Sequence, residues 1–356
     1  MAERTPTALG FGKMLDPKGH LASSPWQMPP RAWKDIATRT YKRTWDDNVA
    51  LVAAGVAFYA FFALFSILGL IVLAYGFVAE PRTVVDNMRS LTAVLPTDVA
   101  LIIGQQLMTA VRSSSETKGL GILLAAAVAI YGGTNGAAAV LTAMNIAYEE
   151  KEKRSLVRFY LLAVGMTFSA LVVALAALAG TAALAYLQHL LPEASRGSVI
   201  IGKIVGYLLL TGVAAAIAST LYRFGPSRED AQWQWITPGS LFAAVALLLL
   251  TWGFGIWVSR FTNYHASYGS LGAVVALLTW MYLSAYAFVF GAELNSEIEH
   301  QTAKDSTTGS PRPMGERGAW AADNVATDDT LQDRPEEQRE GEKLTQAAPK
   351  VAEEKG

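Results

Sequence analysis

The stretch that decides the fold is residues 49–78, VALVAAGVAFYAFFALFSILGLIVLAYGFV, which contains no Asp, Glu, Lys or Arg. About 20 apolar residues in a helix cross a hydrocarbon core of about 30 Å, so this run is long enough to span a membrane. Residues 120–148 form a second run without a charged side chain. The sequence therefore predicts a membrane protein and excludes an ordinary soluble globular domain.

Charged residues are distributed very unevenly along the 356-residue chain. There are 29 Lys and Arg and 30 Asp and Glu, and only 24 of these 59 lie in the 247 positions of residues 49–295. The net charge of −1 gives no overall signal for nucleic-acid binding. The chain has no cysteine, which excludes disulfides, Cys-ligated zinc, iron–sulfur clusters and thiol nucleophiles.

The apolar runs predict an all-α, polytopic membrane protein with six transmembrane helices in one bundle. Helices are expected because lipid offers no partner for free backbone groups, and the runs are too long and too uniformly apolar for barrel strands. The predicted spans are approximately 49–78, 120–147, 157–190, 199–222, 238–259 and 270–294.

The loops between the spans predict the orientation in the membrane. On one side, residues 31–48, 148–158 and 223–237 carry five, four and two Lys or Arg. On the other side, the long segment 79–119 carries four, and residues 191–198 and 260–269 carry one each. The short loops of the first side are the basic ones. By the positive-inside rule both termini are therefore expected to be cytoplasmic.

Segments outside the spans divide the chain further. Residues 1–30 contain five prolines and are expected to be a disordered tail before a membrane domain at 31–298. Residues 31–47 have the pattern of a basic amphipathic helix on the membrane surface, or of a solvated lead-in to the first span. A second amphipathic pattern at 99–111 predicts a helix on the outer face. Residues 299–356 are charged, with few aromatics, and are expected to be a disordered cytoplasmic tail.

Three polar side chains stand out within the predicted spans. Asn135 lies in the middle of the second span and Asn145 near its end, while Glu293 is the only acidic residue within the six predicted spans. Unpaired polar groups are disfavoured in hydrocarbon, so such residues either bond a neighbouring helix or line a path for a substrate or ion. Both interpretations stay open for the asparagines. For Glu293 we favour an interfacial residue over a proton or cation relay.

Two pairs of glycines are spaced four residues apart. Gly132 and Gly136 lie in the second predicted span, and Gly202 and Gly206 lie in the fourth. Small residues at this spacing let helix backbones approach each other closely. We therefore favour helix packing over a substrate site for both pairs.

Catalytic and metal-binding patterns are absent from the sequence. The four histidines form neither a His-x-His pair nor a His-Glu-x-x-His run, and there is no P-loop or dinucleotide fingerprint. No Gly-x-Ser-x-Gly elbow appears either. We expect no metal site, no cofactor and no enzymatic activity.

Six short motifs, in order along the chain, resemble the YihY/BrkB family of bacterial inner-membrane proteins, once labelled ribonuclease BN. They are AAGVAFYAFFALF at 53–65, AMNIAY at 143–148, LYRFGP at 221–226, WITPG at 235–239, YGSLGA at 268–273 and GAELN at 291–295. Arg154 falls where the family's basic loop carries its arginine, whereas Ser66 stands where members commonly have proline. The resemblance covers about residues 31–298 and implies a six-span protein of the inner membrane.

Members of the family that this chain resembles are associated with envelope and virulence phenotypes. The resemblance implies no agreed substrate. The first hypothesis is a transporter or lipid-handling protein, with the lipid bilayer and envelope proteins or lipids as partners. The second is a non-enzymatic scaffold or envelope assembly factor. A ribonuclease ranks last, because the loop at 149–154 reads EEKEKR and its charges cancel, leaving no electrostatic footprint for RNA. The polar path of the first hypothesis would use Asn135, Asn145, Tyr268, Gly269, Gly272 and Glu293.

Overall fold

The computed structural model describes residues 16, 18–78, 115–190, 196–260 and 262–326. Within these ranges the chain is helical, apart from loops and one isolated bridge between Ala231 and Thr307, so the predicted all-α class is confirmed. The elements are η1 (Pro25–Gln27), α2 (Pro30–Asp46), α3 (Val49–Val78), α6 (Ser115–Ala147), α7 (Leu156–Leu190), α8 (Arg196–Phe224), α9 (Trp233–Arg260), α10 (Thr262–His300) and α11 (Trp320–Asp323).

Five helices of the described chain are long and apolar enough to cross a membrane. Their spans are Ala126–Ala147, Leu156–Val173, Ile204–Phe224, Trp233–Trp257 and Val274–His300. A further candidate is α2 joined to Val49–Leu64, a helix pair bent by 64°. The bend falls at Asn48, whose φ of 51° is tolerated by asparagine better than by most residues. The molecule is therefore a multi-pass membrane protein with five or six spans.

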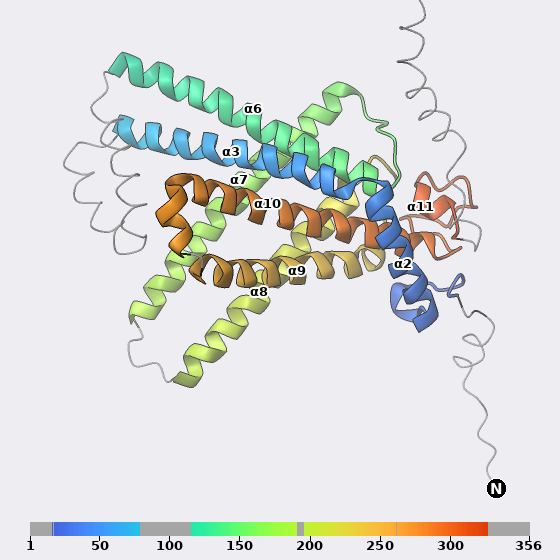
Figure 1. Ribbon diagram of the computed structural model, residues 1–356. Coiled ribbons are helices and arrows are strands. Elements are labelled where there is room, and N and C mark those ends of the chain that lie inside the picture. Colours follow the sequence, from blue (N-terminus) through green and yellow to red (C-terminus); the bar gives the residue numbers. More distant parts are fainter. Residues whose placement is uncertain (1–15, 17, 79–114, 191–195, 261, 327–356) are drawn as a thin grey trace, which may run out of the picture.

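The long helices form one bundle in which α10 is central (Figure 1). Neighbouring helices follow the order α7, α6, α3, α10, α9, α8, and α10 also contacts α2 and α6. The outermost helices α7 and α8 cross the others obliquely (Figure 1). Little of their apolar surface is buried inside the chain. In a membrane this surface faces lipid, which is as apolar as the side chains themselves.

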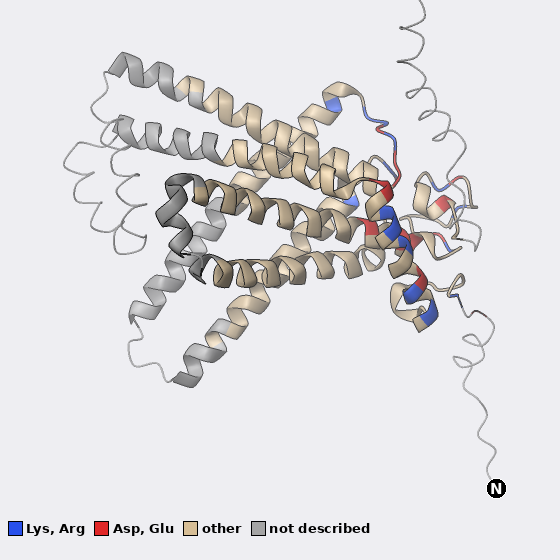
Figure 2. Cartoon of the chain, viewed as in Figure 1, with Lys and Arg blue, Asp and Glu red and all other residues tan. Residues whose placement is uncertain are grey.

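The tightly packed core lies at one end of the bundle, which is also the end where the charged residues gather (Figure 2). Met144 and Tyr148 at the end of α6 pack there with Tyr222 of α8, Ile236 of α9 and Val289 of α10. We call this region the charged end. Val49 of α3 belongs to the same core, which therefore joins residues of α3, α6, α8, α9 and α10.

Both segments flanking the membrane domain differ from their prediction as disordered tails. Ala22 and Met28, from the predicted tail 1–30, are buried in a small apolar cluster with Ile36, Trp235 and Ile298. After α10, residues 301–326 fold back over the charged end and contain buried side chains such as that of Arg317. The overall composition of the tail did not reveal these ordered parts. Each of them is held by a few contacts to the bundle, which average composition does not indicate.

The predicted helix at 31–47 is present as α2, but its buried face is not the aromatic one. Ala32, Ile36, Thr40 and Thr44 are buried, whereas Tyr41 and Trp45 are exposed. Small residues at four-residue spacing allow α2 to lie closely against α10. The amphipathic pattern predicted at 99–111 lies outside the described residues.

Candidate functional site

Buried and partly buried charged and polar side chains form a cluster where α2 crosses α10 at the charged end; the charged residues of this end are coloured in Figure 2. Buried charges are stable only when they are paired or neutralised, so the partners of each group determine what this cluster can do. We call it the terminal cluster; its members are Arg39, Arg43, Tyr148, Arg228, Glu293, Asn295, Glu297, Glu299 and His300.

Glu297 is the best-paired carboxylate on α10. Arg39 Nε lies 2.5 Å from its Oε2 atom, Arg43 Nε lies 3.4 Å from its Oε1 atom, and His300 Nδ1 lies 3.5 Å from Oε2. Arg39 and Arg43 share a face of α2 because they are four residues apart, and Glu293 and Glu297 share a face of α10 for the same reason. Of these two carboxylates, it is Glu297 that forms ion pairs with the two arginines.

Arg228 and Glu299 form a fully buried, two-pronged ion pair. Arg228 Nη1 and Nη2 donate to the two Glu299 oxygens at 3.0 and 2.8 Å, and both side chains have 0% exposure. Burial alone would lower the pKa of Arg228, but the charge and hydrogen bonds of Glu299 raise it. The guanidinium also lies 4.1 Å from the ring centre of Tyr148, whose pKa is raised by burial. Tyr148 is therefore neutral, and Arg228 is charged.

Asn145 connects two loops at the charged end. Its Oδ1 atom accepts from the backbone N–H of Ser227 at 2.7 Å, and its Nδ2 atom donates to Glu152 Oε2 at 2.9 Å. Burial would raise the pKa of Glu152, but hydrogen bonds from Arg154, with help from Asn145, lower it to about 2. These contacts fix the loops after α6 and α8, so Asn145 has a positioning role.

Asn295 bonds the backbone of α9 on both sides of Pro238. Pro238 lies inside that helix and has no N–H to donate to the carbonyl four residues before it. Asn295 Oδ1 accepts from Gly239 N at 2.7 Å, and Asn295 Nδ2 donates to the Ile236 carbonyl at 2.9 Å. The motifs at 235–239 and 291–295 are thus two halves of one contact.

Glu293 lies one turn before Glu297 and has a different environment. Its side chain is buried at 2% exposure, and its Oε1 atom has no hydrogen-bond partner in the described part of the chain. The arginine that faces it, Arg43, is engaged with Glu149 and Glu297. Glu293 is thus buried within the protein at the end of its span, and the favoured interpretation of an interfacial residue stays a prediction.

The residues of the predicted polar path do not converge on one site. Asn145 and Glu293 lie at the charged end, but Asn135 Nδ2 donates to the Tyr131 carbonyl of its own helix at 2.7 Å. Gly272 lies within α10, about 30 Å from Glu293 at about 1.5 Å per residue. Tyr268 and Gly269 belong to the same helix, still earlier along it, and the path stays a prediction.

The two glycine pairs have different surroundings. A Cβ atom on Gly132 would lie 2.9 Å from Phe62 and 3.3 Å from the backbone of Ala63, and one on Gly136 would touch α3 at 3.7 Å. Gly132 and Gly136 therefore pack against α3. A Cβ atom on Gly202 or Gly206 meets nothing within 4 Å, so the packing predicted there has no counterpart within the described chain.

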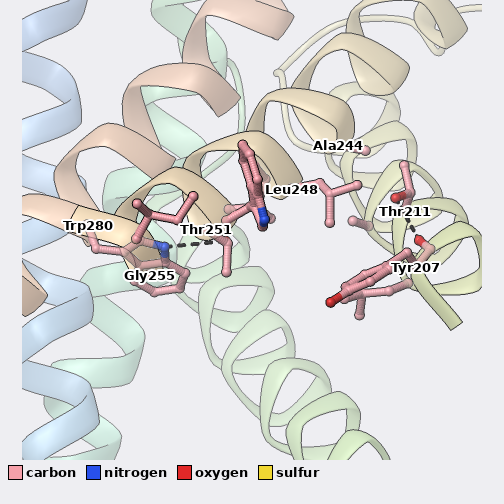
Figure 3. Close-up of a pocket in the computed structure, with 12 residues that line it drawn as sticks. Tyr207, Thr211, Ala244, Leu248, Thr251, Gly255 and Trp280 are labelled. Carbon is pink, nitrogen blue, oxygen red and sulfur yellow. Dashed lines mark hydrogen bonds between the residues drawn. The ribbon is translucent and has the colours of Figure 1, made fainter. Parts of the chain in front are cut away.

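A groove of about 510 Å³ lies between α8 and α9, within the spans (Figure 3). The Tyr207 and Thr211 side chains come from α8, and Thr251 comes from α9. Thr211 Oγ1 donates to the Tyr207 carbonyl at 2.8 Å, and Trp280 Nε1 of α10 donates to Thr251 Oγ1 at 3.4 Å, so these groups already have partners. The lining is uncharged: Tyr207, Leu210, Thr211, Ala214, Ala244, Leu247, Leu248, Thr251, Trp252, Gly255, Ile256 and Trp280.

Sequence reasoning missed the groove and most of the terminal cluster. Arg39, Arg43, Glu297 and Glu299 lay outside the predicted spans or near their ends and so looked like ordinary surface charges. The four-residue spacing of basic residues on α2 and acidic residues on α10 was a usable signal. Within the described residues, no group of three or more His, Cys, Asp or Glu side chains is placed to hold a metal ion.

Comparison with known proteins places these features in a family. Residues 40–315 match the family model described as virulence factor BrkB. The putative ribonuclease-like protein YfkH of Bacillus subtilis (strain 168) is 27% identical over 240 residues, which cover 63% of this chain and 86% of that protein.

Two other relatives match over shorter segments. A UPF0761 membrane protein of Stenotrophomonas maltophilia (strain R551-3) is 36% identical over 78 residues, and one of Xanthomonas oryzae pv. oryzae (strain PXO99A) is 39% identical over 61 residues. These segments cover 22% and 17% of this chain but only 18% and 14% of the relatives. No solved structure matches the chain. Because the family model spans well over half of its residues, the chain belongs to the virulence factor BrkB family of membrane proteins.

Proposed function

We propose that this chain is a non-enzymatic transporter of the bacterial inner membrane that handles a lipid. The groove between α8 and α9 carries the proposal, because it lies within the spans and has no charged side chain in its lining. Its volume lies in the range of ordinary ligand sites, about 300–1,000 Å³. The proposed occupant is the hydrocarbon chain of a membrane lipid.

The opening of the groove supports a lipid over a water-soluble substrate. Tyr207, Leu210 and Trp252 line it and are also among the large exposed apolar residues, so the groove opens sideways where the helices face the bilayer. The polar groups of Thr211 and Thr251 already have hydrogen-bond partners. A polar solute would find little to bind there, whereas a hydrocarbon chain needs no such partner.

Lipid movement in reconstituted vesicles tests this function. The purified full-length protein should accelerate the passage of fluorescent phospholipid between leaflets, and Gly255→Leu should reduce that acceleration by filling the groove. Gly253→Leu is a matched control, because Gly253 lies on the same helix, also has open space around it, and does not line the groove. Equal effects of both variants would overturn the groove assignment. Wild-type protein without lipid movement but with a fixed envelope partner in crosslinking would favour the scaffold.

The location and orientation belong to the same proposal. The basic loops and the family match support an inner-membrane protein with both termini in the cytoplasm. Reporter fusions after Arg112, after Lys151 and in the C-terminal tail test it. The first fusion should report the periplasm and the other two the cytoplasm, and any other pattern would contradict the proposed orientation.

Nucleic acid is not among the proposed partners, although one relative is named ribonuclease-like. Basic side chains of the charged end are engaged with carboxylates of the same chain: Arg43 with Glu149, Arg154 with Glu152, and Arg228 with Glu299. Basic side chains bind nucleic acid by neutralising its phosphates and displacing the counterions condensed on them, and side chains already paired with carboxylates are less able to do so. RNA cleavage by the highly purified protein, with divalent metal added, would contradict this assignment.

A further inference from the structure

We propose that Glu293 is a proton-binding site, and that its carboxyl group is neutral and protonated when the charged end is closed as it is in this structure. The ligand is a proton, held between the turn that joins α2 to α3 and the last part of α10. This inference does not depend on lipid handling.

The immediate geometry of Glu293 leaves an ionised carboxylate poorly compensated. Its side chain has 2% exposure, and Oε1 has no hydrogen-bond partner in the described residues. An isolated buried carboxylate is costly, and binding a proton removes the cost.

The charged groups that face Glu293 make the negative form less favourable still. Asp47, from the turn after α2, and Glu297, on α10, both add negative potential, while Arg43 of α2 opposes them. Arg43 contacts Glu149 and lies 3.4 Å from Glu297, so its charge is shared. Tyr148, at the end of α6, also faces Glu293 and is held neutral by burial.

The other packed helices supply no compensating charge. Residues 49–64 of α3 and 233–257 of α9 contain no Asp, Glu, Lys or Arg. Glu297, one turn away on the same helix, shows the contrast, because Arg39, Arg43 and His300 all lie within 3.5 Å of its carboxylate. The cationic side chains therefore lie around the carboxylate of Glu297, and the carboxyl group of Glu293 binds the proton.

Release of this proton would affect more than one residue. A charge on Glu293 would attract Arg43 away from Glu149, and the Arg43 guanidinium also lies 5.2 Å from the ring centre of Trp320. The backbone N–H of Trp320 in turn donates to Glu150 at 2.6 Å. The proton on Glu293 is thereby linked to the position of the loop after α6 and of the segment that folds over the charged end.

Infrared spectroscopy of the full-length protein in lipid nanodiscs tests the proposal. A protonated carboxylic acid has a C=O stretch that a carboxylate lacks. At pH 7 the wild-type protein should show this band, Glu293→Gln should lose it, and Glu293→Asp should shift it. Glu316→Gln is the control and should retain the band, because Glu316 is exposed.

The wild-type spectrum by itself tests the protonation of Glu293, even if a variant does not fold. Absence of the band from folded wild-type protein at pH 7 would overturn the proposal, as would a band that persists unchanged in folded Glu293→Gln. Lipid movement is measured separately, so its absence would remove the proposed function and leave this assignment intact.

Discussion

The side chain of Asn295 lies against the backbone of Gly239, whose N–H donates to Asn295 Oδ1 at 2.7 Å. Through its Nδ2 atom the same amide donates to the Ile236 carbonyl, so one side chain satisfies a donor and an acceptor on either side of Pro238. A proline inside a helix removes one helical hydrogen bond and weakens that turn. Here a side chain of α10 is hydrogen-bonded to the backbone of α9 at the same turn.

Replacement of Asn295 by Ala should destabilise the bundle. It would remove two buried hydrogen bonds between α10 and α9, each worth about 0.5–1.5 kcal/mol. Unfolding of the purified protein in mixed micelles measures the loss. Asn295→Asp should lie between wild type and Asn295→Ala, since it keeps the acceptor for Gly239 but not the donor for Ile236. Wild-type stability of Asn295→Ala would contradict this account.

The Arg228–Glu299 pair should show strong coupling in a double-mutant cycle. Either Arg228→Met or Glu299→Leu leaves an unpaired buried charge, and breaking a buried pair costs about 3–5 kcal/mol. The double variant removes both charges and should be much more stable than the sum of the single losses implies. Free energies of unfolding for the four proteins give the coupling. Additive losses would show that the pair does not interact as described.

Glycine-to-alanine substitutions should separate close helix contacts from open surface. A Cβ atom on Gly239 would collide with the Gly291 carbonyl, and one on Gly291 would lie 2.7 Å from the Gly239 carbonyl, so both substitutions should lower thermal stability and yield. A Cβ atom on Gly202 or Gly206 would have no neighbouring atom within 4 Å. Gly202→Ala and Gly206→Ala should therefore leave thermal stability unchanged or raise it slightly, because alanine favours the helix over glycine by up to about 1 kcal/mol. Thermal unfolding checks all four, and a uniform response would contradict the assignment.

Glu152 should make the charged end sensitive to acid. Its pKa is lowered from 4.5 to about 2, so the folded state favours its charged form. The resulting stabilisation is fully present above pH 4.5 and is lost as the pH falls through about 2. Acid titration of the unfolding midpoint should therefore show a smaller decrease for Glu152→Gln than for wild type in this window. Parallel curves for the two proteins would indicate that Glu152 does not contribute.

Much of the architecture could be predicted because lipid imposes a simple rule on sequence. A helix that crosses hydrocarbon must be long and free of charge, so each predicted span falls inside a helix of the structure. The contact of Gly132 and Gly136 with α3 follows from local spacing in the same way. Gly202 and Gly206 have the same spacing without a neighbour, because spacing alone does not specify which helix lies opposite.

The terminal cluster was harder to predict because its partners are far apart in the chain. Arg39 and Glu297 meet only when α2 crosses α10, and Arg228 reaches Glu299 from the loop after α8. In the sequence each of these charges has the appearance of a solvated surface residue. Glu293 was identified as unusual from its position in a span, but the burial of its Oε1 atom without a partner among the described residues depends on neighbours that the sequence does not reveal.

The sequence by itself therefore determined the helical class, the approximate limits of the spans and the family, since these depend on local hydrophobicity, charge density and short motifs. Only the tertiary structure decided which carboxylates are paired, that Asn295 is hydrogen-bonded to α9 beside Pro238, and that an uncharged groove lies between α8 and α9. The physical reason is that pairing, burial and cavities are properties of residues brought together across the chain, and a uniformly apolar helix gives no sign of which face meets which neighbour.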